Sequence, residues 1–212
     1  MEFSEGLRLL ESRTRLAVGA AWGVVFTGGL MALGQLLEAM GLANTLYGEG
    51  PLDLLVGLSY VLFLLSLVVS IVVVSMWIYR AHANLRDAGI DGLEFTPGWA
   101  VGWYFIPFAN LFKPFQAMRE LWAASHAESG SFNTEAPPEV RNWWICWIGG
   151  NILSNVSSRI GDGTDPTAYA MANVLGAVAS AIVVGAAVLL IKLMREITAA
   201  QTSGGTSVQV FA

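Results

Sequence analysis

The sequence predicts an all-α, polytopic membrane protein with four transmembrane helices, and three observations support this prediction. Of its 212 residues, 55% are hydrophobic and only 13% are charged, which is about half the charged share of a typical soluble domain. The charges are bunched, so long uncharged runs lie between them. Lysine and arginine are also unevenly spread along the chain. Together these features favour a membrane protein over a soluble domain with a large core.

Four uncharged segments are predicted to cross the membrane. A transmembrane helix needs about 20 mostly apolar residues, with a range of about 17 to 25. Residues 16–37, 54–79 and 167–191 satisfy this length, and the predicted span 142–160 has an uncharged part, residues 142–158, that lies at its lower limit. In that fourth segment Arg159 extends the apolar run by reaching its charged end toward the surface.

A fifth segment, residues 97–112, is predicted to be re-entrant or interfacial. Sixteen residues make a helix of about 24 Å, whereas the hydrocarbon core is about 30 Å thick. If every segment crossed, six of the lysine and arginine residues would lie on the cytoplasmic side and five on the outer side. With a re-entrant segment, ten lie on the cytoplasmic side and one on the outer side. Because short cytoplasmic loops are enriched in these residues, the re-entrant arrangement is preferred over a short span kinked at Pro107. Thr96 and Pro97 predict that a half-helix begins there.

The predicted spans form a single transmembrane domain, residues 16–195, with both termini cytoplasmic. Residues 1–15 are a cytoplasmic N-terminal segment, and residues 196–212 are predicted to be a flexible cytoplasmic tail. Residues 114–127 carry apolar side chains on one arc and polar side chains on the other. This pattern predicts an amphipathic helix along the cytoplasmic surface; a helix packed on the rest of the protein is the alternative.

Two stretches resemble the signature of a known family. "WIYRAHANLRDAG" (residues 77–89) and "FTPGWAVGWYFIPFANLFKPFQAMRELW" (residues 95–122) are similar to the bacterial family called domain of unknown function 4328. The later "WWICW" (residues 143–147) is similar to the tryptophan-rich helix of that family. Its members are small multi-pass membrane proteins without an established activity. The resemblance therefore implies a bacterial plasma-membrane protein, but no reaction and no ligand.

A group of basic and aromatic residues is predicted at the cytoplasmic membrane interface. Its members follow the second span and the re-entrant segment, which meet on the same face in the preferred arrangement. Such a group suits anionic lipid phosphates or an acidic partner segment, although the topology rule alone also requires basic residues there. The candidate lipid- or partner-binding residues are Arg80, His82, Asn84, Arg86, Trp99, Trp103, Asn110, Lys113, Arg119, Glu120 and Trp122.

Small polar side chains recur at helical spacing on the last two predicted spans. Such stripes commonly join helices, where a buried interhelical hydrogen bond contributes about 0.6 kcal/mol. The functional alternative is a polar path for a neutral solute. The residues of this candidate polar path are Asn151, Ser154, Asn155, Asn173 and Ser180.

The sequence offers no pattern typical of catalysis, a cofactor or a metal site. Apart from Arg159 at the end of the fourth segment, the predicted segments contain no Asp, Glu, Lys, Arg or His, which argues against a proton-coupled transporter. His82 and His126 lie on different segments, whereas a metal site generally needs three or four close donors. Cys146 is the only cysteine, which excludes an intrachain disulfide. The net charge of −5 without a basic stripe argues against a nucleic-acid partner.

The leading functional hypothesis is a non-enzymatic integral protein of the bacterial inner membrane that acts as an interaction or accessory module. Its basic, tryptophan-rich cytoplasmic face would contact membrane lipids, another membrane protein or a second copy of the chain. The alternative hypothesis is a small channel or facilitator for a neutral or anionic solute. We expect no catalytic residues and no cofactor in either case.

Overall fold

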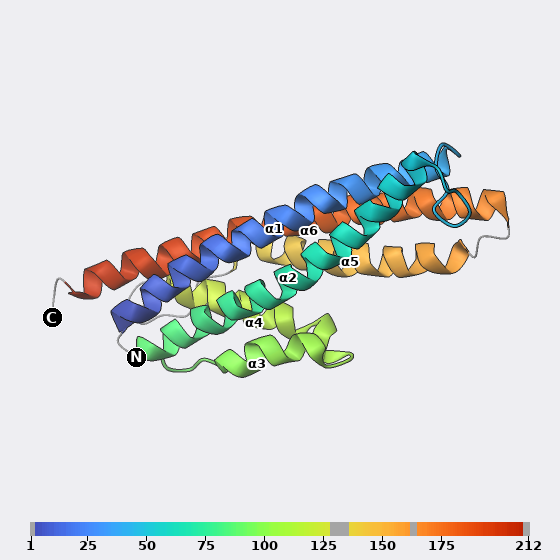
Figure 1. The fold of residues 1–212 in the computed structure, drawn as a ribbon. Helices are drawn as coiled ribbons and strands as arrows, with labels where there is room; N and C mark the ends of the chain where they lie inside the picture. Colours follow the sequence, from blue (N-terminus) through green and yellow to red (C-terminus); the bar gives the residue numbers. More distant parts are fainter. Residues whose placement is uncertain (1–2, 128–135, 162–164, 210–212) are drawn as a thin grey trace. The chain divides into compact units, whose positions relative to one another are not determined.

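The computed structural model describes residues 3–127, 136–161 and 165–209, and over these residues all the regular secondary structure is helical. The longest elements are α1 (Phe3–Ala39), α2 (Pro51–Asp87), α5 (Pro138–Ile160) and α6 (Pro166–Gln209) (Figure 1). The predicted all-α class is confirmed for this part of the chain. Each long helix extends beyond the span predicted within it, because polar residues at the helix ends continue the helix past the apolar run.

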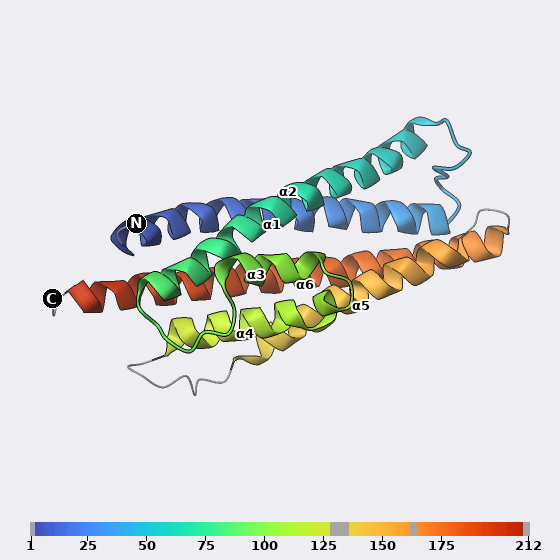
Figure 2. The same cartoon turned by 90° about the horizontal axis from the view of Figure 1, so that it is seen from below.

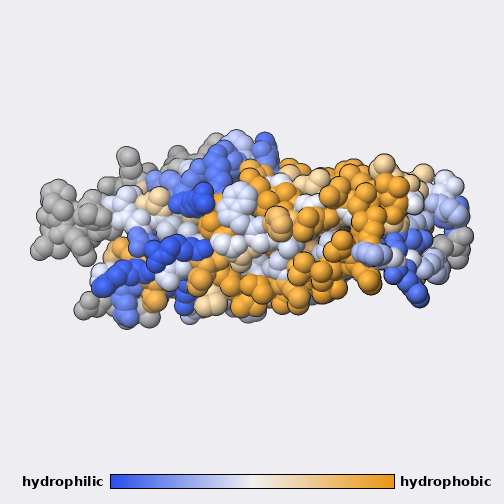
Figure 3. All heavy atoms as spheres, turned by 45° about the horizontal axis from the view of Figure 1, so that its top comes forward, coloured by the Kyte–Doolittle hydropathy of each residue, from blue (hydrophilic) through white to orange (hydrophobic). Residues whose placement is uncertain are grey.

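Three of the described helices are long and apolar enough to cross a membrane: α1, α2 and residues Pro166–Ser203 of α6. In the most apolar part of each, only 22%, 17% and 39% of the residues are buried. Apolar side chains accordingly form a broad area of the face drawn in Figure 3. An exposed apolar surface of this extent suits lipid rather than water. α5 is not among the three, so a fourth crossing stays a prediction.

The chain divides into two compact units, to each of which α1, α2 and α6 all contribute. Unit 1 comprises Met1–Gly19, Ile71–Arg141 and Leu189–Ala212. Unit 2 comprises Ala20–Ser70 and Asn142–Val188. Unit 1 therefore contains the start of α1, the end of α2, the end of α6 and the whole segment predicted to be re-entrant.

In unit 1, residues 97–112 form short helical pieces instead of one continuous helix. The pieces are α3 (Pro97–Gly102) and two 3₁₀ helices, η1 (Trp103–Phe105) and η2 (Ala109–Leu111). The Thr96 side chain accepts a hydrogen bond from the Trp99 backbone N–H at 3.3 Å, and Pro97 occupies the first turn. The predicted half-helix start is thus confirmed. After η1 and η2 the chain reverses, and α4 (Lys113–His126) contacts α3 (Figure 2).

α4 is the predicted amphipathic helix, but its apolar face packs against the protein. Met118 and Leu121 are 2% and 0% exposed, and Phe115 and Trp122 on the same arc are half-buried. This burial supports the packing alternative, and the position of α4 along the cytoplasmic surface stays a prediction. The physical reason is that the other helices of unit 1 supply apolar partners, which the pattern of α4 alone does not reveal.

The predicted flexible tail also requires correction, because α6 continues as a helix to Gln209. Ile197, Thr198 and Gln201 are buried. They occupy the core of unit 1, and this packing extends the helix well past the predicted boundary at residue 195. The composition of the segment, "ITAAQTS", carries no strong signal for such burial.

Candidate functional site

The predicted binding residues divide into a buried group and an exposed group, both in unit 1. Arg80, His82 and Asn84 of α2 are 6%, 1% and 1% exposed. The structure therefore buries these three residues in the interior of unit 1. Lipid or a partner at the surface does not reach them there. His82 Nδ1 lies 3.0 Å from the Ile78 carbonyl oxygen of the preceding turn. The sequence shows these residues following an apolar run, but not that neighbouring helices cover them.

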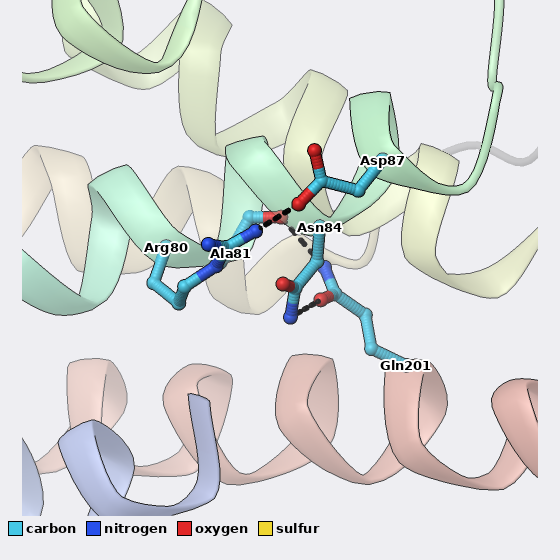
Figure 4. A network of polar contacts seen from close by, with 5 residues as sticks. All are labelled: Arg80, Ala81, Asn84, Asp87 and Gln201. Carbon is cyan, nitrogen blue, oxygen red and sulfur yellow. Dashed lines mark hydrogen bonds and ion pairs between the residues drawn. The ribbon is translucent and has the colours of Figure 1, made fainter. Parts of the chain in front are cut away.

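Arg80 and Asn84 belong to a set of polar contacts that joins α2, α4 and α6. Figure 4 shows the members on α2 and α6. Arg80 forms an ion pair with Asp87. Asn84 Nδ2 donates to Gln201 Oε1 at 3.3 Å. Gln201 Nε2 donates to the Ala81 carbonyl oxygen at 3.1 Å and to Ser125 Oγ at 2.9 Å. We call these residues the buried network, of which Asp87 is an exposed edge member: Arg80, Ala81, Asn84, Asp87, Ser125 and Gln201.

α1 joins the same region through hydroxyl groups and one close contact. The Thr198 hydroxyl lies 2.8 Å from that of Thr14 and accepts a hydrogen bond from Trp77 Nε1 at 3.2 Å. A Cβ added at Gly6 would lie 2.6 Å from Asn84 Oδ1, so glycine permits the close approach of α1. Buried polar groups are costly unless they are hydrogen-bonded. Thr198 and Gln201 fall within the predicted tail, residues 196–212, so the sequence did not indicate that they are buried.

The exposed group lies around the hairpin formed by α3 and α4. The side chains of Arg86, Trp99 and Arg119 are exposed, and those of Trp103 and Lys113 are half-buried. We call these five residues the rim. The rings of Trp99 and Trp103 are 4.9 Å apart between centroids. Lys113 Nζ lies 5.9 Å from the centre of the Trp103 ring, so one base lies close to the two indole rings. That the rim binds lipid or a partner stays a prediction.

The bases of the rim also contact groups of the protein itself. Lys113 Nζ lies 3.1 Å from Glu94 Oε1 and 5.2 Å from the centre of the Phe95 ring. The Arg119 guanidinium lies 6.0 Å from the centre of the Phe115 ring. Cation–π contacts at exposed sites contribute about 0.5–1 kcal/mol. These contacts hold the positive charges near aromatic rings while leaving Arg119 accessible.

Glu120 has a structural role in this region. Its two carboxylate oxygens accept backbone N–H groups of Glu94 at 2.6 Å and Phe95 at 3.1 Å. Arg86 Nη2 donates to the Phe95 carbonyl oxygen at 3.3 Å, so the connection before α3 is fixed from both α2 and α4. Burial raises the pKa of the Glu120 carboxyl group and the negative charge of Glu94 adds to the rise, while the two backbone hydrogen bonds oppose it.

Two further predicted residues, Asn110 and Trp122, are half-buried. The Asn110 backbone N–H donates to the Ile106 carbonyl oxygen at 3.0 Å, within the turn between α3 and α4. Trp122 stacks on His126, with ring centroids 3.9 Å apart. Its indole N–H is buried without a hydrogen-bond partner among the described residues.

The turn between α3 and α4 exposes large apolar side chains. Phe105 and Phe108 are 67% and 81% exposed, and Leu111 and Phe112 are about half exposed. We call these four residues the apolar turn. Phe108 has φ 65°, a left-handed backbone conformation that is uncommon for residues other than glycine. The sequence places the apolar turn inside the re-entrant segment but does not indicate which of its side chains are exposed.

The candidate polar path is not assembled within the chain. Asn151, Ser154 and Asn155 are exposed on α5. The side-chain amides of Asn151 and Asn155 donate to the carbonyl oxygens of Trp147 and Asn151, at 2.7 and 2.9 Å. Helical spacing predicts that these residues share a face but does not specify which neighbour that face meets.

The other two members of the candidate path lie on α6. Ser180 is buried, and its hydroxyl donates to Gln35 Oε1 of α1 at 2.9 Å. Asn173 is half-buried. The contact between Ser180 and Gln35 is the interhelical hydrogen bonding that the sequence offers as the alternative to a path. We therefore do not advance a solute path as a function of the single chain.

Unit 2 contains a buried carboxylate, Glu38, which lies just beyond the first predicted span, residues 16–37. Glu38 is 3% exposed. Its Oε1 accepts hydrogen bonds from the Thr45 backbone N–H at 3.0 Å, the Thr45 hydroxyl at 2.6 Å and the Tyr169 hydroxyl at 2.6 Å. Its Oε2 accepts one from the Tyr60 hydroxyl at 2.6 Å. We call Glu38, Thr45, Tyr60 and Tyr169 the Glu38 cluster.

Three helices of membrane-spanning length and hydropathy place the chain in the class of α-helical membrane proteins. The model of one family, described as Domain of unknown function (DUF4328), matches residues 51–199. The chain therefore belongs to the DUF4328 family, as the resemblance predicts. The match begins at the start of α2 and ends within α6, so it includes the whole rim and the apolar turn. No curated protein and no solved structure matches the chain.

Proposed function

We propose that this chain is a non-enzymatic, four-span protein of the bacterial plasma membrane that serves as an accessory module at the cytoplasmic face. Its rim would bind anionic lipid headgroups while its apolar turn enters the bilayer. The observation that carries the proposal is the position of the apolar turn, which is exposed and belongs to the same short hairpin as Lys113 and Arg119.

The grouping of charges supports a hairpin that returns to the side from which it came. Of the eleven lysine and arginine residues, ten belong to unit 1 and only Arg159 belongs to unit 2. α3 and α4 share unit 1 with the start of α1 and the end of α6. If residues 97–112 crossed the membrane, α4 would lie at the opposite end of the spans. The grouping therefore favours four crossings with both termini cytoplasmic, because basic residues collect on the cytoplasmic side.

Shallow insertion of the apolar turn follows from energy and geometry. Full burial of one phenylalanine or leucine side chain is favourable by about 1.5–3 kcal/mol, so four partly exposed side chains provide a substantial gain. Backbone groups in lipid need internal hydrogen bonds. The turn supplies some of them, since the N–H groups of Leu111 and Phe112 donate to the carbonyl oxygens of Phe108 and Ala109 at 3.1 and 3.2 Å.

The bases of the rim suit headgroup phosphates. A lysine or arginine near an anionic membrane surface contributes about 1 kcal/mol to binding. Glu94 partly neutralises Lys113, so we expect the two arginines, Arg86 and Arg119, to contribute more. Exposed indole rings such as that of Trp99 settle at headgroup depth.

A lipid-retention measurement tests this proposal. The full chain is purified from membranes, and co-purifying phosphatidylglycerol and cardiolipin are quantified by native mass spectrometry. We expect the triple variant Arg86→Gln, Lys113→Gln, Arg119→Gln to lose most of the bound anionic lipid. The matched control, Arg8→Gln, Arg15→Gln, Arg195→Gln, removes the same charge from exposed positions of unit 1 and should retain it. Equal loss in both variants would show that the rim has no specific role; a protein lost instead of lipid would identify a protein partner.

Cysteine labelling tests the topology. In a Cys146→Ser background, which has no other cysteine, Tyr47→Cys and Arg119→Cys are exposed to a membrane-impermeant maleimide in intact spheroplasts. We expect labelling at position 47 only. Labelling at position 119 would refute the re-entrant arrangement and with it the cytoplasmic rim.

A further inference from the structure

Unit 2 contains a cavity of about 340 Å³ beside the Glu38 cluster. Its lining comes from the end of α1, the following loop and the first turns of α6, and includes Glu38, Asn44, Tyr47, Tyr169 and Ala170. Small-molecule sites have volumes of about 300–1,000 Å³, with mostly apolar walls and a few polar groups. This cavity lies at the small end of that range and fits the same description.

Glu38, one of the lining residues, has a buried carboxylate without a positive partner. All four hydrogen bonds to Glu38 come from uncharged donors, and among the described residues Glu38 takes part in no ion pair. Hydrogen bonds donated to a carboxylate favour its ionised form. A buried charge is stabilised further when an opposite charge approaches it. The Glu38 cluster therefore holds a negative charge that a cation in the cavity would neutralise.

The surroundings favour a cation over an anion or a neutral molecule. In sequence, unit 2 has five acidic residues and a single base, Arg159, which is exposed in the last turn of α5. Two tyrosines line the cavity, and aromatic rings attract ammonium groups by about 0.5–2 kcal/mol depending on desolvation. A carboxylate with aromatic neighbours discriminates against inorganic anions, and apolar walls favour an organic cation over a fully hydrated metal ion.

We propose that this cavity binds the ammonium group of a small organic cation, with the Glu38 carboxylate as its counter-charge and Tyr47 and Tyr169 as its aromatic neighbours. A free amine and the headgroup of an aminophospholipid share this chemistry. The proposal is independent of the lipid-binding rim, which belongs to unit 1 and selects the opposite charge.

Fluorine NMR of the full chain tests the proposal. The protein, whose five tyrosines are replaced by 3-fluorotyrosine, is placed in nanodiscs of phosphatidylglycerol only, and single Tyr→Phe variants assign the signals. We expect tetramethylammonium to shift the signals of Tyr47 and Tyr169 saturably. Tyr104, which belongs to unit 1, serves as the internal control and should not move. tert-Butanol, a neutral molecule of similar size, should cause no saturable shift.

Variants of the lining separate a specific site from a general effect. Ala170→Leu fills the cavity and should weaken tetramethylammonium binding at least tenfold. Ala181→Leu, at an exposed position of α6 outside the lining, should leave it unchanged. Glu38→Gln should also abolish binding. If the Glu38→Gln variant fails to fold, Ala170→Leu alone still decides the test.

Nanodiscs that contain phosphatidylethanolamine distinguish the two sources of the ammonium group. If the headgroup occupies the cavity, the Tyr47 and Tyr169 signals shift without added cation and tetramethylammonium competes. If a free amine is the ligand, they shift only when the cation is added. The absence of a saturable shift with tetramethylammonium and with phosphatidylethanolamine, or an equal shift with tert-butanol, would overturn the proposal.

Discussion

Units 1 and 2 bury their polar groups in different ways. Unit 1 distributes polarity over many partners: amides and hydroxyls link four helices, an ion pair lies within α2, and ten bases share the unit with eleven acidic residues. In unit 2 four uncharged donors meet a single carboxylate, that of Glu38. A distributed arrangement loses little when one member is removed, whereas a central carboxylate leaves several donors without an acceptor. The comparison therefore predicts a different sensitivity to mutation in each unit.

The largest effect is expected for Glu38→Ala. The change leaves the hydroxyl groups of Tyr60 and Tyr169 and both Thr45 donors without their acceptor, and hydrogen bonds to charged groups contribute about 1.5–3 kcal/mol each. Because water and relaxation recover part of this, we expect the free energy of unfolding to fall by about 3 kcal/mol. Thermal unfolding in detergent, followed by circular dichroism, measures this loss of free energy. Glu49→Ala, at an exposed loop position, is the control. An equal loss in both variants would contradict the greater sensitivity to mutation that we expect at Glu38.

A smaller effect is expected for Gln201→Leu in unit 1. This variant removes three hydrogen bonds of the buried network, but the remaining members keep other contacts, so we expect a loss of about 2 kcal/mol. Adding Asn84→Leu should cost less than the sum of the two single changes, because it removes a partner already left unpaired. Strict additivity of the two changes would contradict a shared network.

Adjacent glycines on α5 test packing within unit 2. A Cβ at Gly150 would lie 2.7 Å from Val183 Cγ2 and 3.3 Å from the Ala179 carbonyl oxygen, whereas a Cβ at Gly149 meets nothing within 4 Å. Overpacking a tight contact costs about 1–3 kcal/mol, and we expect Gly150→Ala to fall at the lower end. Gly149→Ala should be neutral or stabilising by up to about 1 kcal/mol through helix propensity. A reversed order of their melting temperatures would mean that α5 does not pack on α6 through Gly150.

The smallest effect concerns the pH dependence of unit 1 through Glu120. Its pKa is raised in the folded chain, so protonation is easier in the folded than in the unfolded state. The resulting stabilisation is complete below the pKa of the unfolded glutamate and is lost as the pH rises through the folded pKa. We expect the wild type to gain stability relative to Glu120→Gln as the pH is lowered, by less than about 0.5 kcal/mol because the half-exposed group is screened.

An NMR titration of the Glu120 carboxyl group gives a direct check. Glu94→Gln should lower the pKa of Glu120, since the negative charge of Glu94 contributes to the rise. A pKa that does not respond to this change would leave burial as the sole cause.

Local signals in the sequence were sufficient for the boundaries of the hairpin. Thr96 as an N-cap, Pro97 in the first turn and the interruption around Pro107 follow from backbone chemistry that acts within a few residues. The side chains that each helix covers could not be predicted in the same way. His82 and Asn84 follow an apolar run and look interfacial, yet α4 and α6 supply the contacts that bury this region.

The Glu38 cluster shows the same limit more strongly. Glu38 follows an apolar run and begins an acidic loop, which is typical of a solvent-exposed end. Its partners lie 7, 22 and 131 residues away in sequence. A hydrogen bond between residues so far apart has no signature in a single sequence, whereas periodicity and capping do. The predicted binding group could be recognised from its residue types, but only the structure divides it into the rim and the buried residues Arg80, His82 and Asn84.

The last helix has a consequence for biogenesis. Tyr169 and Ser180 complete contacts in unit 2, while Thr198 and Gln201 complete contacts in unit 1, and all four residues belong to α6. During synthesis the earlier helices leave the ribosome with Glu38, Gln35, Thr14 and Asn84 lacking these partners. A chain truncated before Pro166 would keep two of the three most apolar helices and still be unable to close either core. We therefore expect quality-control proteases to degrade such a fragment faster than the full-length protein.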